Sequence, residues 1–284
     1  MPESMSDPMS RQLEGKTAII TGAGRGIGEG IAKTLVARGA RVAVSDVSAD
    51  AAATVAKEIV DAGGEAISSH ADVTSADSMQ AFVDSAIAHF GQIDICVANA
   101  GVIGGPGFQD RKDYNDDDWD LTLGVNVRGI VKTADAIVPH MKERRSGKII
   151  NIASHAGRAP RGVAEPGRGN VQSPYSVSKA AAIQWTHLLA IDLGPFNINV
   201  NAVCPGRLWT PMWEKLATNR KVLNPELSHL SAREIFELAI TTTMPLGEAQ
   251  TPEDIGKTVA FLASDDAAQI TGQALNVNGG AILS

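Results

Sequence analysis

Short apolar runs of strand length recur along the chain and are separated by longer stretches in which apolar residues have helical spacing. The runs of strand length are Thr17–Thr21, Arg41–Asp46, Glu65–His70, Ile93–Ala98, Lys148–Ala153, Ile198–Cys204 and Ala274–Val277. The helical stretches are Glu29–Arg38, Ala49–Ala62, Met79–Phe90, Trp119 to about Met141, Tyr175–Leu193 and Pro252–Ala263. This alternation predicts an α/β fold with one doubly wound, seven-stranded parallel sheet flanked by helices.

Three segments fall outside this alternation. Residues 1–12 are polar and contain Pro2 and Pro8, so we expect a flexible tail and neither a signal peptide nor a folded element. Residues 13–284 then form a single domain. Within it, residues 208–243 are expected to be a mobile and largely helical lid, and residues 155–174 form a long loop.

Composition argues against several classes of function. The 284-residue chain has a net charge of −7 and no basic stripe, which argues against a nucleic-acid partner. No apolar run approaches the ~20 residues needed to cross a bilayer, so no membrane partner is expected. Cys96 and Cys204 lie far apart and without Cys/His ligand spacing, so we expect reduced thiols, no metal site and a cytoplasmic location.

The segment Ser173–Lys179 carries the first candidate chemistry. Pro174 suits the first turn of a helix, and Tyr175 and Lys179 then project from one helical face, a turn apart. A lysine ammonium ~4 Å from the phenol, at an effective dielectric constant of ~20, favours the phenolate by roughly 4 kcal/mol and lowers the phenol pKa by ~3 units. The pair is therefore predicted to exchange a proton near neutral pH, although an isolated Tyr-x-x-x-Lys is more often an ordinary surface pair.

A glycine-rich turn, Gly22–Gly28, follows the first predicted strand and opens the first helix. Glycines let the backbone turn sharply and approach a pyrophosphate, which the helix N-terminus then holds. Asp46 ends the second strand, where a carboxylate accepts hydrogen bonds from the adenine-side ribose of NAD and repels a 2′-phosphate. It is less suited to capping the next helix than Ser48. Arg25 favours a 2′-phosphate instead, but the carboxylate outweighs an exposed arginine, so NAD is predicted and NADP is less favoured.

Two further segments lie between the second strand and the middle of the chain. Asn99–Gly101 follows the fourth predicted strand, at the carboxyl edge where parallel sheets bind ligands, and its small residues leave room for a cofactor. Asp110–Asp120 is strongly acidic but lacks the alternating spacing of a calcium loop. We expect it to be a solvated helix start with favourable charge–dipole placement.

Taken in order, these motifs resemble those of the short-chain dehydrogenase/reductase family, a group with a Rossmann-like fold. The resemblance runs from Leu13 to the C-terminus, with one enlargement: Ser154 and Tyr175 are 21 positions apart, several more than is usual. The resemblance implies a catalytic set made of Asn126, Ser154, Tyr175 and Lys179. It implies cofactor contacts from Gly22, Arg25, Gly26, Ile27, Gly28, Asp46, Asp72, Val73, Asn99, Ala100, Gly101, Tyr175, Lys179, Pro205, Gly206, Leu208 and Thr210.

The same resemblance implies a role for each catalytic residue. Tyr175 would exchange the proton of the substrate oxygen, and Ser154 would hydrogen-bond that oxygen. Lys179 would hold the nicotinamide ribose and lower the tyrosine pKa, while Asn126 would keep a relay water behind the lysine. The implied activity is NAD(H)-dependent interconversion of a secondary alcohol and a ketone, in a homotetramer. An NADPH-dependent carbonyl or 3-oxoacyl reductase and a non-catalytic nucleotide sensor stay as alternatives.

The substrate itself is not defined by these motifs. His155, Arg207, Trp209 and Trp213 are candidates for contact with it, and the two tryptophans equally fit packing on the protein body. The enlarged loop carries three arginines that would favour an anionic substrate if they reach it, or do little if they lie in solvent: Arg158, Arg161 and Arg168.

Overall fold

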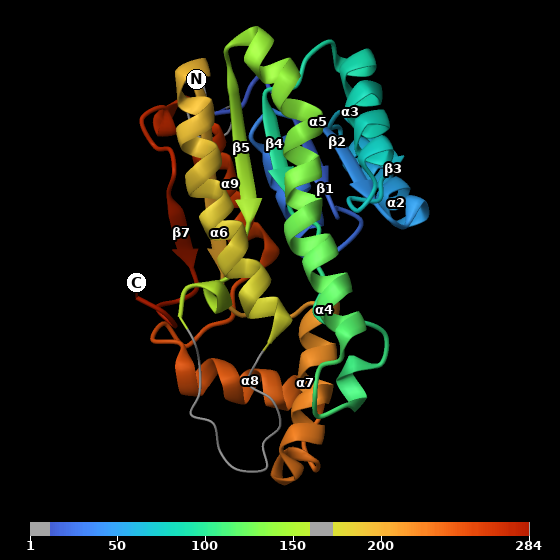
Figure 1. The fold of residues 1–284 in the computed structure, drawn as a ribbon, viewed down its shortest axis with the longest axis vertical. Helices are drawn as coiled ribbons and strands as arrows, with labels where there is room; N and C mark the ends of the chain where they lie inside the picture. The colour runs from blue at the N-terminus through green and yellow to red at the C-terminus, as the bar shows by residue number, and fades with distance from the viewer. Residues whose placement is uncertain (1–11, 160–172, 284) are drawn as a thin grey trace, which may run out of the picture.

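The computed structural model describes residues 12–159 and 173–283. Its centre is a seven-stranded sheet with the order β3-β2-β1-β4-β5-β6-β7, and every neighbouring pair is parallel (Figure 1). The strands are β1 Thr17–Thr21, β2 Arg41–Asp46, β3 Ala66–His70, β4 Ile95–Ala98, β5 Gly147–Ile152, β6 Ile198–Pro205 and β7 Ala274–Val277. The predicted doubly wound sheet is confirmed.

Helices cover both faces of the sheet. One core cluster joins the sheet to α1 (Gly26–Ala37), α2 (Ala49–Asp61) and α9 (Pro252–Ala263). The other joins it to α3 (Ala76–Phe90), α5 (Gly129–Arg144) and α6 (Pro174–Leu193), of which α5 and α6 lie in front of the sheet in Figure 1. Because both faces are covered, the central strands β1 and β4 are buried at every position and do not alternate between apolar and polar residues.

The predicted helix from Trp119 to about Met141 has a different structure. It begins at Asp116, inside the acidic run that was expected to start a helix, because Asn115 forms a capping box with Asp118. Helix α4 (Asp116–Leu123) then passes through a π-helical turn, Gly124–Arg128, before α5 begins. Such turns occur often at functional sites, and this one carries Asn126.

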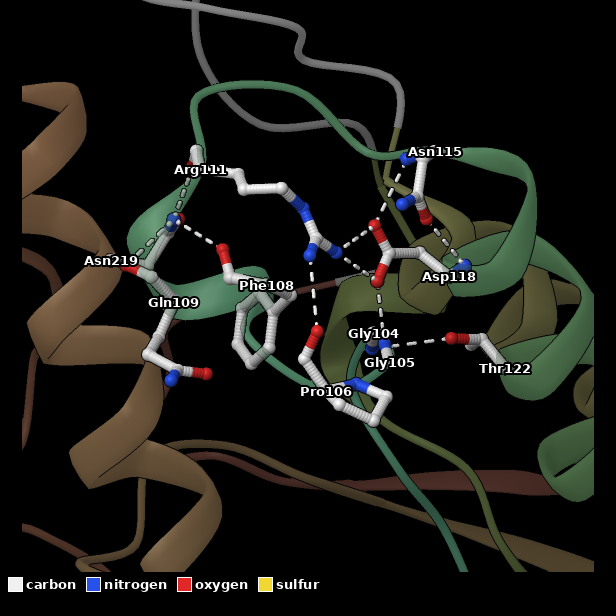
Figure 2. Close-up of polar contacts among 10 residues, drawn as sticks. All are labelled: Gly104, Gly105, Pro106, Phe108, Gln109, Arg111, Asn115, Asp118, Thr122 and Asn219. Carbon is white, nitrogen blue, oxygen red and sulfur yellow. Dashed lines mark hydrogen bonds and ion pairs between the residues drawn. The ribbon is translucent and has the colours of Figure 1, made fainter.

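The predicted solvated acidic run is wrong at one position. Asp116 and Asp117 are exposed in the first turn of α4, as expected, but Asp118 is fully buried. Its carboxylate accepts hydrogen bonds from Arg111 and from the backbone amides of Gly105 and Asn115 (Figure 2). These donors replace the water that a buried carboxylate would otherwise lose.

Residues 208–243 are largely helical, as predicted. They contain α7 (Pro211–Leu223), a short 3-10 turn and α8 (Ala232–Thr243), which share a small core built around Trp213 and Phe236. Gln12, assigned by sequence to the tail, is tied to Ser264 and Asp266, whereas residues 1–11 and 160–172 lie outside the described part of the chain. Within the described residues, no helix is both long and apolar enough to span a membrane.

Candidate active site

A cavity of about 1460 Å³ opens at the carboxyl ends of the strands. It extends from the ends of β1 and β2, past the ends of β4 and β5, to α7. Strand β1 lies between β2 and β4, so the chain reverses its winding direction there, which is where doubly wound sheets bind nucleotides. The fold and this cavity are therefore those of a nucleotide-binding α/β protein.

The glycine turn forms one end of the cavity. Gly22 has a φ of +62°, and a Cβ on Gly28 would lie 2.4 Å from both Asn99 Nδ2 and the Gly22 carbonyl oxygen. Asn99 Nδ2 donates to the carbonyls of Thr21 and Gly22 at 2.9 Å, which joins the end of β4 to the turn. Gly26, Ile27 and Gly28 line the cavity and begin α1, so the unpaired amides of that helix start lie beside it.

Asp46 lies beside this turn at the end of β2. Its carboxylate accepts hydrogen bonds from the amides of Gly24 at 3.1 Å and Ser48 at 3.0 Å. Ser48, not Asp46, caps α2, as the sequence indicated. Arg25 is exposed at the rim, and the exposed side chain of Val47 adds an apolar surface next to Asp46 that sequence reasoning missed.

Asp72 and Val73 lie beyond the end of β3 and line the same cavity. The amide and hydroxyl of Thr74 donate to the Asp72 carboxylate, and these bonds hold its pKa below the ordinary value. Val73 is buried against Gly129 at the start of α5. Both positions are therefore fixed by local contacts rather than free to move.

Tyr175, Ser154 and Lys179 come together at the far end of the cavity. The Ser154 hydroxyl, at the end of β5, hydrogen-bonds the Tyr175 phenol and accepts a bond from the Ala156 amide at 3.1 Å. Lys179, one turn along α6, is 3% exposed and donates to the Ile152 carbonyl at 2.8 Å. Its Nζ lies 5.7 Å from the centre of the Tyr175 ring.

The predicted lowering of the tyrosine pKa is wrong for this structure. Burial raises the pKa of Tyr175 above its ordinary value, and the hydrogen bond from Ser154 only partly opposes this effect. Burial also lowers the pKa of Lys179 to about 8. The sequence argument assumed an ammonium ~4 Å from the phenol and omitted the cost of removing both groups from water, which is the larger effect here.

Asn126 lies behind this group. Its side chain is fully buried, and it exchanges two hydrogen bonds with the Val102 backbone and donates to the Ser178 hydroxyl at 2.9 Å. A Cβ on Gly101 would lie 3.4 Å from both Asn126 Oδ1 and Lys179 Nζ, so both side chains approach Gly101 closely. Asn126 therefore fixes the strand end beside Lys179.

The chain after β6 closes the cavity. Pro205, Gly206 and Leu208 line it, and Thr210 caps α7 by accepting from the Trp213 amide. The Thr210 methyl lies 3.7 Å from where a Cβ on Gly26 would be. The start of α7 is therefore next to the glycine turn.

The four substrate candidates have different surroundings. His155 and Arg207 are buried and line the cavity, and Arg207 donates to the Thr243 hydroxyl. Trp213 also lines it, with its ring 5.0 Å from Phe236. Trp209 packs 5.3 Å from the same Phe236 and is not among the described residues that line the cavity, which matches the packing alternative.

Of the three loop arginines, the structure describes Arg158 alone, and it is not among the described residues that line the cavity. Arg158 donates to the Ala274 carbonyl of β7 at 3.0 Å. Arg161 and Arg168 lie outside the described residues. The cavity wall that sequence reasoning missed comes from a different segment, 103–115, through Phe108 and Tyr114. No motif marks this segment, because its contacts are made by tertiary packing.

Comparisons with known proteins agree with this geometry. A family model described as enoyl-(acyl carrier protein) reductase matches residues 22–281. The chain is 37% identical over 273 residues to a probable tetrahydroxynaphthalene reductase of Zymoseptoria tritici, covering 96% of each. It is 38% identical over 278 residues to the versicolorin reductase of Emericella nidulans, covering 98% of this chain and 99% of the relative.

A solved structure is similar along the whole chain. It is 7α-hydroxysteroid dehydrogenase complexed with NADH and 7-oxo glycochenodeoxycholic acid, with a TM-score of 0.79, 33% identity and 99% of each chain covered. With the family match over residues 22–281, this likeness identifies the class. The chain belongs to the short-chain dehydrogenase/reductase family of nicotinamide-dependent oxidoreductases.

Proposed function

We propose that this oxidoreductase interconverts a secondary alcohol and a ketone with NAD(H), using Ser154, Tyr175, Lys179 and Asn126. The observation that carries the proposal is the hydrogen-bonded pair of hydroxyls, Ser154 and Tyr175, at one end of a cavity whose other end is the glycine turn. One cavity can thus take a dinucleotide and a substrate side by side.

The residues present fit a nicotinamide dinucleotide. The missing Cβ atoms at Gly22 and Gly28 let the turn pack closely against Ala100 and Asn99, and a Cβ on Gly26 would meet only the Thr210 methyl, at 3.7 Å. The start of α1 then provides amide donors for a pyrophosphate. Asp46, Val47, Asp72 and Val73 would hold the adenosine half. Lys179 would hold the ribose at the nicotinamide end, with Leu208 and Thr210 beside the ring.

The protein's own part in the reaction is proton exchange and alignment. The nicotinamide supplies or accepts the hydride when bound. The Tyr175 hydroxyl donates a proton to the carbonyl oxygen during reduction and accepts it from the alcohol during oxidation, while the Ser154 hydroxyl hydrogen-bonds the same oxygen. Because the phenol pKa is raised here and oxidation needs the phenolate, alcohol oxidation should speed up as the pH rises above neutrality.

A screen of secondary alcohols with NAD tests the proposal. We expect reduced nicotinamide to form with at least one class among polyols, hydroxy acids, and cyclic and aromatic alcohols, at a rate that rises with pH. Absorbance of the reduced nicotinamide is the measurement. Dinucleotide binding without turnover of any alcohol, or of any matching ketone with NADH, would instead favour the non-catalytic sensor.

A second cofactor assignment has one observation in its favour. Arg25 is exposed at the rim of the cavity, where its guanidinium can pair with a 2′-phosphate. An NADPH-dependent reductase of carbonyl or 3-oxoacyl compounds would use the same hydroxyl pair and lysine. We favour NAD because the Gly24 amide holds the Asp46 carboxylate beside the glycine turn, where it would repel a 2′-phosphate.

We also propose a homotetramer, with the helices that carry Asn126 and Tyr175 at one interface and the β7 edge at another. In support of this, Leu188 and Ile191 on α6 are 53% and 76% exposed. Contact of these apolar side chains with water is unfavourable, and an interface would remove it. Light scattering should give a mass four times the chain mass of 29.7 kDa. A monomer mass at micromolar concentration would contradict this.

A further inference from the structure

One wall of the cavity is formed by residues 103–115, which connect β4 to α4 and which we call the wall segment. Phe108 and Tyr114 of this segment line the cavity. Their rings are nearly parallel, with an angle of 10° and centres 6.3 Å apart. The segment has little regular structure beyond a short 3-10 turn at Phe108–Asp110, so its shape depends on the side chains that hold it.

Helix α4 holds the wall segment through a buried carboxylate. Asp118 accepts from the Gly105 amide at 2.6 Å and from Arg111 Nη2 at 2.7 Å, and Thr122 accepts from the Gly104 amide at 3.2 Å (Figure 2). Burial disfavours the ionised form of Asp118, but hydrogen bonds from the Asn115 amide, Arg111 and the Gly105 amide outweigh it and keep its pKa below the ordinary value. The carboxylate is thus ionised and fully bonded at neutral pH.

The start of helix α6 holds the wall segment at a second point. The Ser173 hydroxyl hydrogen-bonds the Tyr114 phenol. Ser173 is also the residue that caps α6, two positions before Tyr175. The wall segment is therefore joined to the helix that carries Tyr175 and Lys179.

Helix α7 supplies a third attachment, through one side chain. Asn219 is 5% exposed, and its Nδ2 donates to the carbonyls of Arg111 at 2.8 Å, Phe108 at 3.1 Å and Gln109 at 3.4 Å (Figure 2). These carbonyls belong to the part of the wall segment that turns around Phe108. A side chain from a different region of the sequence thus replaces the backbone partners that a regular strand or helix would provide.

The same helix begins at the proposed cofactor site. Thr210, its N-cap, lies beside Gly26 of the glycine turn. Asn219 is nine residues further along the chain, on α7, which is about 13.5 Å at a rise of ~1.5 Å per residue. A rigid helix of this length connects the glycine turn to the wall segment.

We propose that Asn219 is a positioning residue that determines substrate specificity. It fixes the wall segment to α7, so that the Phe108 side of the pocket and the Trp213 side keep one shape, and ordering of α7 by a bound dinucleotide also orders the wall. The specificity part rests on the proposed oxidoreductase function. The mechanical part, the coupling of α7 to the wall, does not depend on it.

Hydrogen–deuterium exchange tests the mechanical part. In Asn219→Leu, which keeps the size of the side chain but removes its donors, exchange of residues 104–115 should become about tenfold faster, the effect of one or two lost hydrogen bonds. Added NAD should slow exchange of these residues in the parent but not in the variant. Asn219→Ala is the second variant, should the leucine fold poorly.

Thr218→Val is the matched control, because Thr218 lies one position before Asn219 on the same helix. The change removes a hydrogen bond from the Thr218 hydroxyl to the Glu214 carbonyl. It should leave exchange of residues 104–115 unchanged. The coupling is refuted if neither Asn219 variant changes this exchange relative to Thr218→Val. It is refuted also if exchange in β1 and β4 rises equally, since that would mean general destabilisation.

Kinetics test the specificity part. The ratio of kcat/KM for a bulky aromatic and a small aliphatic secondary alcohol should change about fivefold or more in Asn219→Leu, mainly through KM of the bulky substrate. This ratio does not depend on the fraction of folded enzyme. An unchanged ratio with a loosened wall would overturn the specificity role. A parent that oxidises no alcohol would overturn the proposed function, while the exchange result would still decide the coupling.

Discussion

Replacing Tyr175 with phenylalanine is expected to lower kcat about a thousandfold in both reaction directions. The change removes the one hydroxyl that the proposal assigns to proton exchange, and such catalysis contributes about 10²- to 10⁴-fold. The ring remains in its place on the first turn of α6, so dinucleotide affinity should change less than about threefold. Steady-state rates and a fluorescence titration with NADH measure the two quantities separately.

The chain offers a matched control for this substitution, since it has two tyrosines. Tyr114→Phe also removes a half-buried phenol that is bonded to a serine, but at the pocket wall. It should cost less than tenfold in kcat. If Tyr175→Phe retained a tenth or more of the parent rate, the proton would have to pass through another group and the proposed mechanism would be wrong.

Much of the fold was predictable because each element carries its own local pattern. Most of the seven strands are short and mainly apolar runs, and helix starts such as Ser48 and Thr210 have side chains that cap them. The glycine turn was predictable for a similar reason, since only glycine fits the space at Gly28. In these cases, residues that are close in sequence decide the structure.

The wrong or missed predictions concern residues whose surroundings are formed by segments distant in the sequence. From its place in an acidic run, Asp118 is expected at the surface, but it is fully buried. Arg111 and the Gly105 amide donate hydrogen bonds to its carboxylate. The pKa of Tyr175 depends on burial by surrounding elements, which no spacing of Tyr and Lys reveals. Asn219 looks like an ordinary helix residue, and only the fold brings the three carbonyls of the wall segment to it.

The second large effect is expected at Asp46, where Asp46→Asn should shift cofactor preference toward NADP. The amide keeps the size of the side chain and one acceptor for the Gly24 amide, but removes the negative charge. A carboxylate near a 2′-phosphate in a half-exposed site costs about 2–3 kcal/mol. The ratio of kcat/KM for NADP to that for NAD should therefore rise about 30- to 150-fold.

Asp50→Asn separates this local effect from a change in net charge, because Asp50 is an exposed carboxylate four residues further along, in the first turn of α2. It should leave the ratio of kcat/KM for NADP to that for NAD within about twofold of the parent value, since salt screens the charge of an exposed carboxylate. If Asp46→Asn behaved like Asp50→Asn, the carboxylate would not be what selects the dinucleotide. Arg25 would then set the preference, and the NADPH-dependent reductase would become the better assignment for this site.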